Sequence, residues 1–192
     1  MNDSAATVIG LIRERRLDAD LAALIWLLAE GSVPIHVVAN DENDREAAAA
    51  ALRSLARDAR VVTDGPGEAL EDVLRQPVPL RPATGVVVIL DDAGRVVAAH
   101  LHRPPLRDAA GHVRPQGPAV LATRDAAHED WEHFAWGVLP ELAEAVGRRA
   151  GDFEIEQARR REYLDSLVEA EIDAPEQVAA ALAGFAVPRE TH

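Results

Sequence analysis

The sequence predicts an α/β protein with a small βαβ-containing core, a β-hairpin and a helical C-terminal part. Three observations lead to this fold class. Near the N-terminus, two short β-branched runs flank an alanine-rich segment. In the middle, two such runs are joined by a short turn, and beyond residue 124 the chain is dense in charges and helix-forming residues. We therefore predict an α/β core at 1–123 and a helical part at 124–192.

The first observation is the order strand, helix, strand. The runs at 34–39 and 60–63 each contain two consecutive valines, and the alanine-rich segment between them, at 45–58, is predicted to be a helix. A helix of this length carries the chain across a sheet, so we expect the two strands to be parallel. A more apolar helix at 21–30, which ends at Gly31, precedes this unit.

The second observation is the hairpin. Residues 85–90 and 95–102 are apolar and rich in valine, and the segment Asp91-Asp92-Ala93-Gly94 joins them. Four turn residues that end in glycine are typical of a β-hairpin. The proline-containing stretch 103–117 is predicted to be a loop, and 119–123 one more strand.

The third observation is the change of character in the last third of the chain. Here we predict a helix that contains Trp131, Phe134 and Trp136, and then a long helical region at 140–172 that begins with a proline. A last helix is predicted at 176–185. If the region 140–172 were one continuous helix, it would be longer than the core of a small domain can cover.

Composition and charge exclude several classes of function. All 20 basic side chains are arginines, because the chain has no lysine, and it has no cysteine. It therefore lacks a P-loop lysine, a Schiff-base lysine, disulfides and thiolate metal ligands. A formal net charge of −13 is unfavourable beside nucleic-acid phosphates and anionic lipids.

These exclusions decide which partners and which location we expect. We expect a protein partner or self-association, with no nucleic acid, no membrane insertion and no cofactor. No apolar run approaches the length of a membrane span, and the N-terminus lacks the basic region of a secretory signal. A cytoplasmic location is therefore expected.

The loop after the first predicted strand occupies the place of a P-loop. In that motif a strand is followed by glycine, four residues, glycine, lysine and a hydroxyl residue, and then by a helix. Here Ala39 and Asp44 stand in place of the two glycines, Arg45 in place of the lysine, and Glu46 in place of the hydroxyl residue. Without the glycines the backbone cannot easily wrap a phosphate, and the carboxylates would repel it. We interpret this vestigial P-loop position as an acidic loop that caps a helix.

Two other patterns favour structural roles over catalysis. Asp91 and Asp92 end an apolar strand, as the acids of a second nucleotide motif do, but a hairpin turn is the simpler interpretation. His100 and His102 share one face of a strand and are candidate metal ligands, although a zinc site needs a third protein ligand. No serine lies in a glycine-flanked nucleophile elbow. We therefore assign no catalytic residue and no metal site.

Apolar side chains in the C-terminal part are candidates for a protein interface. Trp131, Phe134 and Trp136 lie within six residues of one another in a chain that is 4% aromatic, and such residues serve either as core or as interface anchors. A stripe on the long helical region must meet the last helix, another copy of the chain or a partner. The interface candidates are Trp131, Phe134, Trp136, Leu164, Leu167 and Val168.

Taken in order, these elements resemble the type II/IV secretion and pilus-assembly ATPases, which are P-loop proteins. The resemblance covers about residues 11–102. It is carried by the helix Leu21-Ala-Ala-Leu-Ile-Trp-Leu-Leu28, the strand and loop Val33–Glu46, Val62-Thr63, the segment Glu68-Ala-Leu-Glu-Asp-Val-Leu74, which is similar to the one after the family's histidine box, and the hairpin Val86–His102.

The resemblance implies a degenerate relative that does not hydrolyse ATP. The phosphate-binding glycines, the lysine, the hydroxyl and the histidine before the Glu68 segment are all missing. We therefore expect a non-catalytic, ATPase-like interaction or scaffold protein associated with a secretion or pilus system. One alternative is a nucleotide- or small-molecule-responsive module with a residual pocket near Arg45. Another is a metal-dependent hydrolase that uses His100 and His102.

Overall fold

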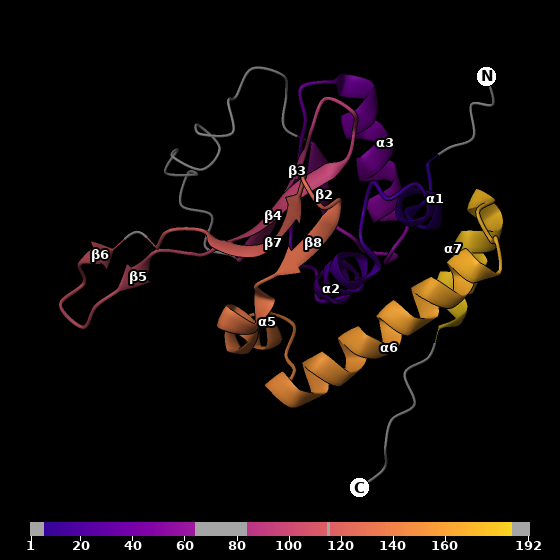
Figure 1. Ribbon diagram of the computed structural model, residues 1–192. Helices are drawn as coiled ribbons and strands as arrows, with labels where there is room; N and C mark the ends of the chain where they lie inside the picture. Colours follow the sequence, from indigo (N-terminus) through magenta and orange to yellow (C-terminus); the bar gives the residue numbers. More distant parts are fainter. Residues whose placement is uncertain (1–5, 64–83, 115, 186–192) are drawn as a thin grey trace, which may run out of the picture.

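The computed structural model describes residues 6–63, 84–114 and 116–185 and confirms the predicted α/β class (Figure 1). Its main element is a six-stranded mixed sheet, and a separate two-stranded sheet is formed by β5 (Leu106–Arg107) and β6 (Val113–Arg114). The strands of the main sheet, in spatial order, are β2 (Val61–Thr63), β1 (Ile35–Val38), β3 (Gly85–Leu90), β4 (Val96–His102), β7 (Ala119–Asp125) and β8 (Asp130–His133).

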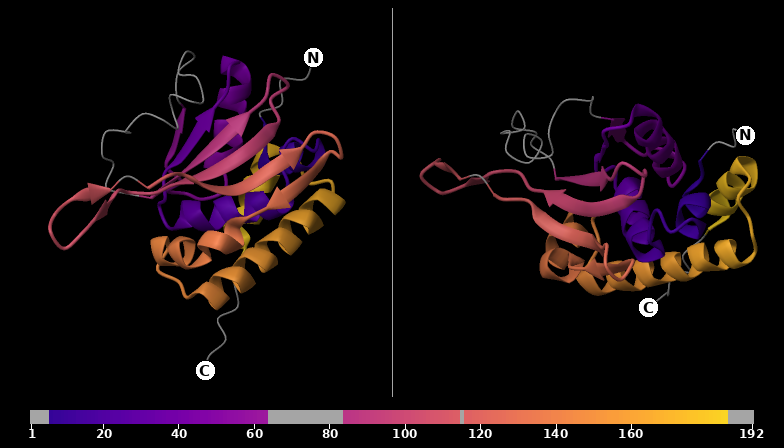
Figure 2. Two further views of the ribbon diagram at one scale, coloured as in Figure 1. Left: turned by 60° about the vertical axis from the view of Figure 1, so that its left-hand side comes forward. Right: turned by 45° about the horizontal axis from the view of Figure 1, so that its top comes forward.

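Helices cover one face of this sheet in two layers (Figure 2). The described helices are α1 (Val8–Arg13), α2 (Ala19–Glu30), α3 (Glu42–Arg53), the short 3₁₀ helix η1 (Ala135–Val138), α5 (Leu139–Ala145), α6 (Ala150–Glu169) and α7 (Pro175–Gly184).

The βαβ unit and the hairpin form as predicted. Strand β1 pairs in parallel with β2 on one side and with β3 on the other, and α3 connects β1 to β2. Strands β3 and β4 pair antiparallel, with Val87 opposite His100. The predicted strand at 119–123 is β7, which pairs antiparallel with β4. The predicted helix that includes residues 68–75 lies outside the described residues.

The segment around Trp131 corrects the sequence-based prediction. It is not a helix but the edge strand β8, which pairs antiparallel with β7, and Arg124 lies opposite Trp131. The turn before β8 contains Glu129 at a positive φ of 53°. The alternation of exposed and half-buried residues in Asp-Trp-Glu-His has the two-residue period of a strand. Pairing with β7 decides the conformation of this short segment.

Helix α2 lies at the centre of the fold, between the sheet and α6 (Figure 1). Ten of its 12 residues are buried, so it has almost no polar face. The carboxylate of Asp18 caps its first turn by accepting a hydrogen bond from the Leu21 amide at 2.8 Å, and Gly31 ends it. A helix that is apolar on all sides must be covered on all sides.

Helix α6 supplies the outer cover. The predicted region 140–172 is not one continuous helix, because α5 ends at Ala145 and Gly147 adopts a positive φ of 66° before α6 begins. Helix α6 then packs across α2 and α1. Two of the interface candidates, Leu164 and Leu167, are buried in this packing, and Val168 packs partly buried against the same core. The apolar stripe therefore meets the chain's own helices.

A buried arginine anchors α6 on α2. The guanidinium of Arg160 donates to Glu30 at 2.5 Å and to Glu156 at 3.2 Å, and its Cζ lies 5.2 Å from the centre of the Trp26 ring. Only 2% of Arg160 is exposed. The ring of Phe185, just after α7, lies 4.9 Å from that of Trp26, and the hydroxyl of Tyr163 donates to the Ala181 carbonyl of α7 at 2.9 Å. These contacts close the last helices over α2.

The boundary predicted between residues 123 and 124 falls inside β7. One hydrophobic core contains residues from both sides of it, for example Trp26 and Val88 before it and Phe153 and Leu182 after it. Among the helices that the structure describes, none is both long enough and apolar enough to cross a membrane.

Replacing Arg160 by methionine is expected to lower the free energy of unfolding by about 2 kcal/mol, because its charged hydrogen bonds and its contact with Trp26 are lost. Urea denaturation followed by circular dichroism measures this. Arg161→Met, on the exposed side of the same helix, is the matched control and should stay within about 0.5 kcal/mol of the native chain. Equal effects of the two variants would show that Arg160 is not an anchor.

Candidate functional site

The carboxyl ends of β1 and β3 form a topological switch point. From β1 the chain passes through α3 to β2 on one side, while β3 lies on the other side of β1. In open α/β sheets, ligands bind in the crevice at such a point. The two segments that meet here are the vestigial P-loop position and the β3–β4 turn, so the fold brings together the two patterns noted in the sequence.

Polar contacts join these two segments directly. The side-chain amide of Asn40 donates to the carboxylate of Asp92 across the switch point at 2.9 Å. The carboxylate of Asp41 accepts from the Asp44 amide at 2.9 Å and caps α3. This confirms the interpretation of the loop as an acidic helix cap.

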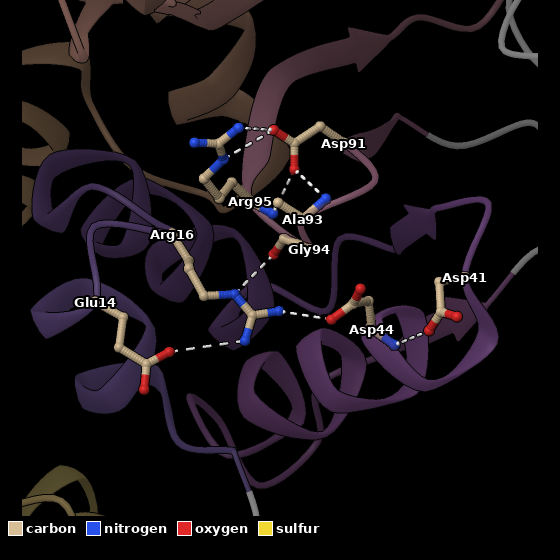
Figure 3. Close-up of polar contacts among 8 residues, drawn as sticks. All are labelled: Glu14, Arg16, Asp41, Asp44, Asp91, Ala93, Gly94 and Arg95. Carbon is tan, nitrogen blue, oxygen red and sulfur yellow. Dashed lines mark hydrogen bonds and ion pairs between the residues drawn. The ribbon is translucent and has the colours of Figure 1, made fainter.

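Arg16, from the link between α1 and α2, lies in the middle of this cluster (Figure 3). Its Nε donates to the Gly94 carbonyl at 3.0 Å, and its Nη2 donates to the Asp44 carboxylate at 2.9 Å. Gly94 has a positive φ of 68°, and a Cβ there would collide with both Arg16 and Asp44. The positive φ favours glycine at this position, and a larger residue would also displace the end of the Arg16 side chain. The guanidinium of Arg16 thus joins the helix cap of α3 to the β3–β4 turn.

Asp91 is held by the turn that it begins, as the hairpin interpretation predicted. One carboxylate oxygen accepts from the amides of Ala93 and Arg95, each at 2.9 Å, and the other accepts from the Arg95 guanidinium at 2.9 Å. Burial alone would raise the pKa of Asp91, but these hydrogen bonds outweigh it and lower the pKa. The carboxylate is therefore committed to the turn.

The four residues of the vestigial P-loop position have separate roles. Asp44 binds Arg16, and Glu46 pairs with Arg53 on the exposed side of α3 at 3.7 Å. Arg45 is only 4% exposed, and its Nη1 donates to the Ala39 carbonyl at 3.3 Å. The Nε of Arg45 has no hydrogen-bond partner in the described structure. A buried guanidinium donor without a partner is unusual, because its desolvation is costly.

His100 and His102 lie on one face of β4, as their spacing predicts, and the buried core residues Ala99 and Leu101 lie on the other face. His100 is opposite Val87 and His102 is opposite Gly85, while His36 on β1 is also opposite Val87. Burial lowers the pKa of His100. Across the described ranges, no group of three or more histidine, aspartate or glutamate side chains is placed to hold a metal ion.

The aromatic interface candidates separate into two environments. Trp131 packs partly buried against the core, whereas Phe134 and Trp136 are exposed. Trp136, in η1, has 74% of its surface exposed. The Phe134 amide donates to the Leu121 carbonyl at 2.8 Å, so this segment lies beside the start of β7.

A cluster that the sequence did not indicate joins β8, α2 and α6. The Nε2 of His133 lies 3.2 Å from the Asp18 carboxylate, and its Nδ1 lies 3.9 Å from that of Asp20. Gln157 of α6 donates to Asp20 at 3.0 Å. The prediction placed His133 in a helix, and because the partners are more than 100 residues apart in sequence, only the strand conformation of β8 brings them together.

The charges of this cluster explain its pKa shifts. The hydrogen bond to Asp18 and the nearby carboxylates of Asp20 and Asp130 raise the pKa of His133, against the effect of burial. Burial would raise the pKa of Asp18, but hydrogen bonds from His133 and from the Leu21 amide lower it overall. Below its ordinary pKa of 6.5, the imidazolium of His133 therefore ties the edge strand to the start of α2.

Comparison with protein-family models finds none that matches this chain, and comparison with curated protein sequences finds no significant match.

Arg16→Ala is expected to lower the free energy of unfolding by about 2 kcal/mol, because the Asp44 carboxylate and the Gly94 carbonyl both lose a partly buried donor. Arg95→Ala is the control. It removes an equally short ion pair to Asp91 from a more exposed position and should cost at most about 1 kcal/mol. Urea denaturation at low salt measures both variants. A larger loss for Arg95→Ala would contradict the central role of Arg16.

The His133 cluster should make stability depend on pH. Because folding raises the pKa of His133 above its usual value of 6.5, its contribution is complete below pH 6.5 and is lost as the pH rises through the folded pKa. The free energy of unfolding of His133→Gln should therefore fall below that of the native chain by about 1 kcal/mol at a pH of about 5.5, and by less at a pH of about 9.

His128→Gln is the control for this measurement. His128 also faces an aspartate, Asp125, but its side chain is 79% exposed, so solvent should screen the pair at both pH values. Urea denaturation of the three proteins at the two pH values makes the comparison. If the difference between the native chain and His133→Gln grows as the pH rises, folding does not raise the pKa of His133.

Proposed function

We propose that this protein is a non-catalytic interaction or scaffold protein that binds protein partners around the start of β7. The observation that carries the proposal is the distribution of exposed large hydrophobic residues. Among the described residues there are seven of these, and five lie either on the β5–β6 hairpin or at its base. The five are Leu106, Val113, Val120, Phe134 and Trp136.

Three of these five are what we call the base patch: Val120 in β7, and Phe134 and Trp136 in the segment that follows β8. Val120 lies near the start of β7, and η1, which carries Trp136, packs beside β7. Tryptophan is enriched among the residues that dominate binding energy at protein interfaces. An exposed tryptophan beside other apolar side chains marks an interaction surface more often than an isolated apolar residue does.

The contacts at the switch point support the non-catalytic part of the proposal. Arg16 lies between Asp44 and Gly94, and Asn40 is bonded to Asp92, so these polar groups at the switch point are engaged with one another. The relation to the secretion and pilus-assembly ATPases, and a role beside such a system, remain proposals that rest on the sequence resemblance.

A second candidate function is a module that responds to a small anionic ligand near Arg45. One observation favours it: in the part of the chain that the structure describes, the Nε of this buried guanidinium has no hydrogen-bond partner, so it is a donor that an anion could accept from. The carboxylates of Asp41, Asp44 and Glu46 oppose it by repulsion. Saturable micromolar binding of ATP that disappears in Arg45→Gln would favour this candidate over the first.

The proposal predicts that Trp136 is required for partner binding. The chain, tagged and expressed in its native host, should enrich at least one protein reproducibly, and Trp136→Ala should reduce that enrichment about tenfold, which corresponds to about 1.4 kcal/mol. Ile155→Ala is the matched control, because Ile155 is also an exposed apolar residue, at 53%, but lies on α6. Its enrichment should equal that of the native chain.

The partner found in this way is then purified, and its dissociation constant is measured with the same variants. Thermal unfolding confirms that Trp136→Ala remains folded, which is expected for so exposed a side chain. If every enriched protein is retained equally by Trp136→Ala and by Ile155→Ala, the base patch is not the interaction surface and the proposed function is wrong.

A further inference from the structure

The β5–β6 hairpin projects from the main sheet as an arm, which we define as residues 103–114 (Figures 1 and 2). It interrupts the connection between β4 and β7, which are neighbours in the sheet. All residues from Leu106 to Arg114 are exposed. The sheet does not need this excursion, because a short turn would join two antiparallel neighbours equally well.

The arm is internally braced. At its base, the guanidinium of Arg103 donates to the Gly117 carbonyl at 3.1 Å and 2.7 Å, and Gln116 donates to the Pro104 carbonyl at 2.7 Å. At its tip, Asp108 accepts from the amides of Ala110 and His112, each at 2.9 Å. The hairpin therefore has a defined shape, although a two-stranded hairpin is only marginally stable in water. Contact with a further surface would stabilise it.

Both faces of the arm combine an apolar and a positively charged side chain. Leu106 pairs with Arg114, and Arg107 pairs with Val113, and paired residues point to the same face. Leu106 and Val113 are 58% and 44% exposed. A complementary surface must therefore offer apolar contact together with negative charge.

The charge of the arm is opposite to that of the rest of the chain. Residues 103–114 contain three arginines and one aspartate, which gives a formal charge of +2. Since the whole chain has a formal charge of −13, the remaining residues together carry −15. Exposed acidic residues lie on the elements that flank the base patch: Glu132 on β8, and Glu141 and Glu144 on α5. Glu141 also pairs with Arg103 at the base of the same chain's arm, at 3.4 Å. One chain thus presents both an apolar, basic arm and an apolar, acidic base.

We propose that two copies of the chain form a symmetric dimer in which the arm of each copy lies against the base patch of the other. This inference rests on the proposed function, because it names the first partner of the same surface. Each copy contributes one arm and one base patch, so two copies satisfy each other and leave no surface for a third. The dimer therefore buries two arms and two patches at once. It also gives Trp136 an apolar neighbour in Leu106 or Val113.

Duplex nucleic acid is the other ligand that an arginine-bearing β-ribbon can take. The charge of −15 on the rest of the chain would repel the phosphates on either side of the arm. Charge complementarity therefore favours the second copy, and binding to DNA becomes an outcome of the test.

Sedimentation velocity of the full chain at micromolar concentration is expected to show a dimer. Arg107→Glu combined with Arg114→Glu should weaken dimerisation at least tenfold, and Arg57→Glu with Arg60→Glu should leave it unchanged. Arg57 and Arg60 are also exposed but lie between α3 and β2. A variant in which an Asn-Gly turn replaces residues 103–117 should be a folded monomer, because β4 and β7 remain paired.

The absence of cysteine from the chain allows a direct test of the contact. Leu106→Cys and Trp136→Cys are made in separate, differently sized copies, mixed and oxidised. A disulfide between the two copies is expected, whereas Leu106→Cys mixed with Ile155→Cys should give none. Because each copy carries a single thiol, an intramolecular bond cannot form.

Three results would overturn the inference. The first is a native chain that is monomeric at all concentrations. The second is a dimer that persists without the arm. The third is a monomer that binds a short DNA duplex and loses this binding in the Arg107→Glu, Arg114→Glu variant. If the chain is monomeric but Trp136→Ala still abolishes capture of a different protein, the dimer is refuted while the proposed function stands.

Discussion

Helix α2 has to be covered on every side, and most of the fold follows from this constraint. Ten of its 12 residues are buried. Exposing so much apolar surface to water would cost more free energy than the helix gains from its own hydrogen bonds. The sheet covers one side and α6 packs along another, and α1 belongs to the same hydrophobic core. Arg160 lets a polar helix carry out this role, because its guanidinium lies over Trp26 while its charge is neutralised by Glu30 and Glu156.

Because α6 covers α2, the candidate interaction surface is not on α6, where the sequence pattern placed part of it. The apolar stripe with Leu164 and Leu167 packs into the chain's own core, so it is not presented to a partner. What stays exposed is Trp136 in η1, together with the apolar side chains of the arm. The same C-terminal segment thus contributes a structural cover in α6 and an exposed anchor a few residues before it.

At the switch point, the sequence identified the two segments that meet, but it did not identify Arg16, which joins them. The replacement of the P-loop glycines and lysine was visible in the sequence, and so was the turn at Asp91. Arg16 was not singled out, because it is 28 residues from Asp44 and 78 from Gly94 along the chain. Only the fold shows that a third segment, with Arg16, reaches the β3–β4 turn and contacts the carbonyl of Gly94.

The sequence by itself determined the elements whose signals are local: the apolar helix ended by Gly31, the parallel βαβ unit, the β3–β4 hairpin and the alternation that places His100 and His102 on one face. Periodicity, caps and turn residues act within a few positions, so they can be read from the chain alone. Only the tertiary structure decided that residues 130–133 form an edge strand, that His133 meets Asp18, and that α6 crosses α2. These outcomes depend on pairing and burial between distant segments, which override the weak local preference of a short or amphipathic stretch.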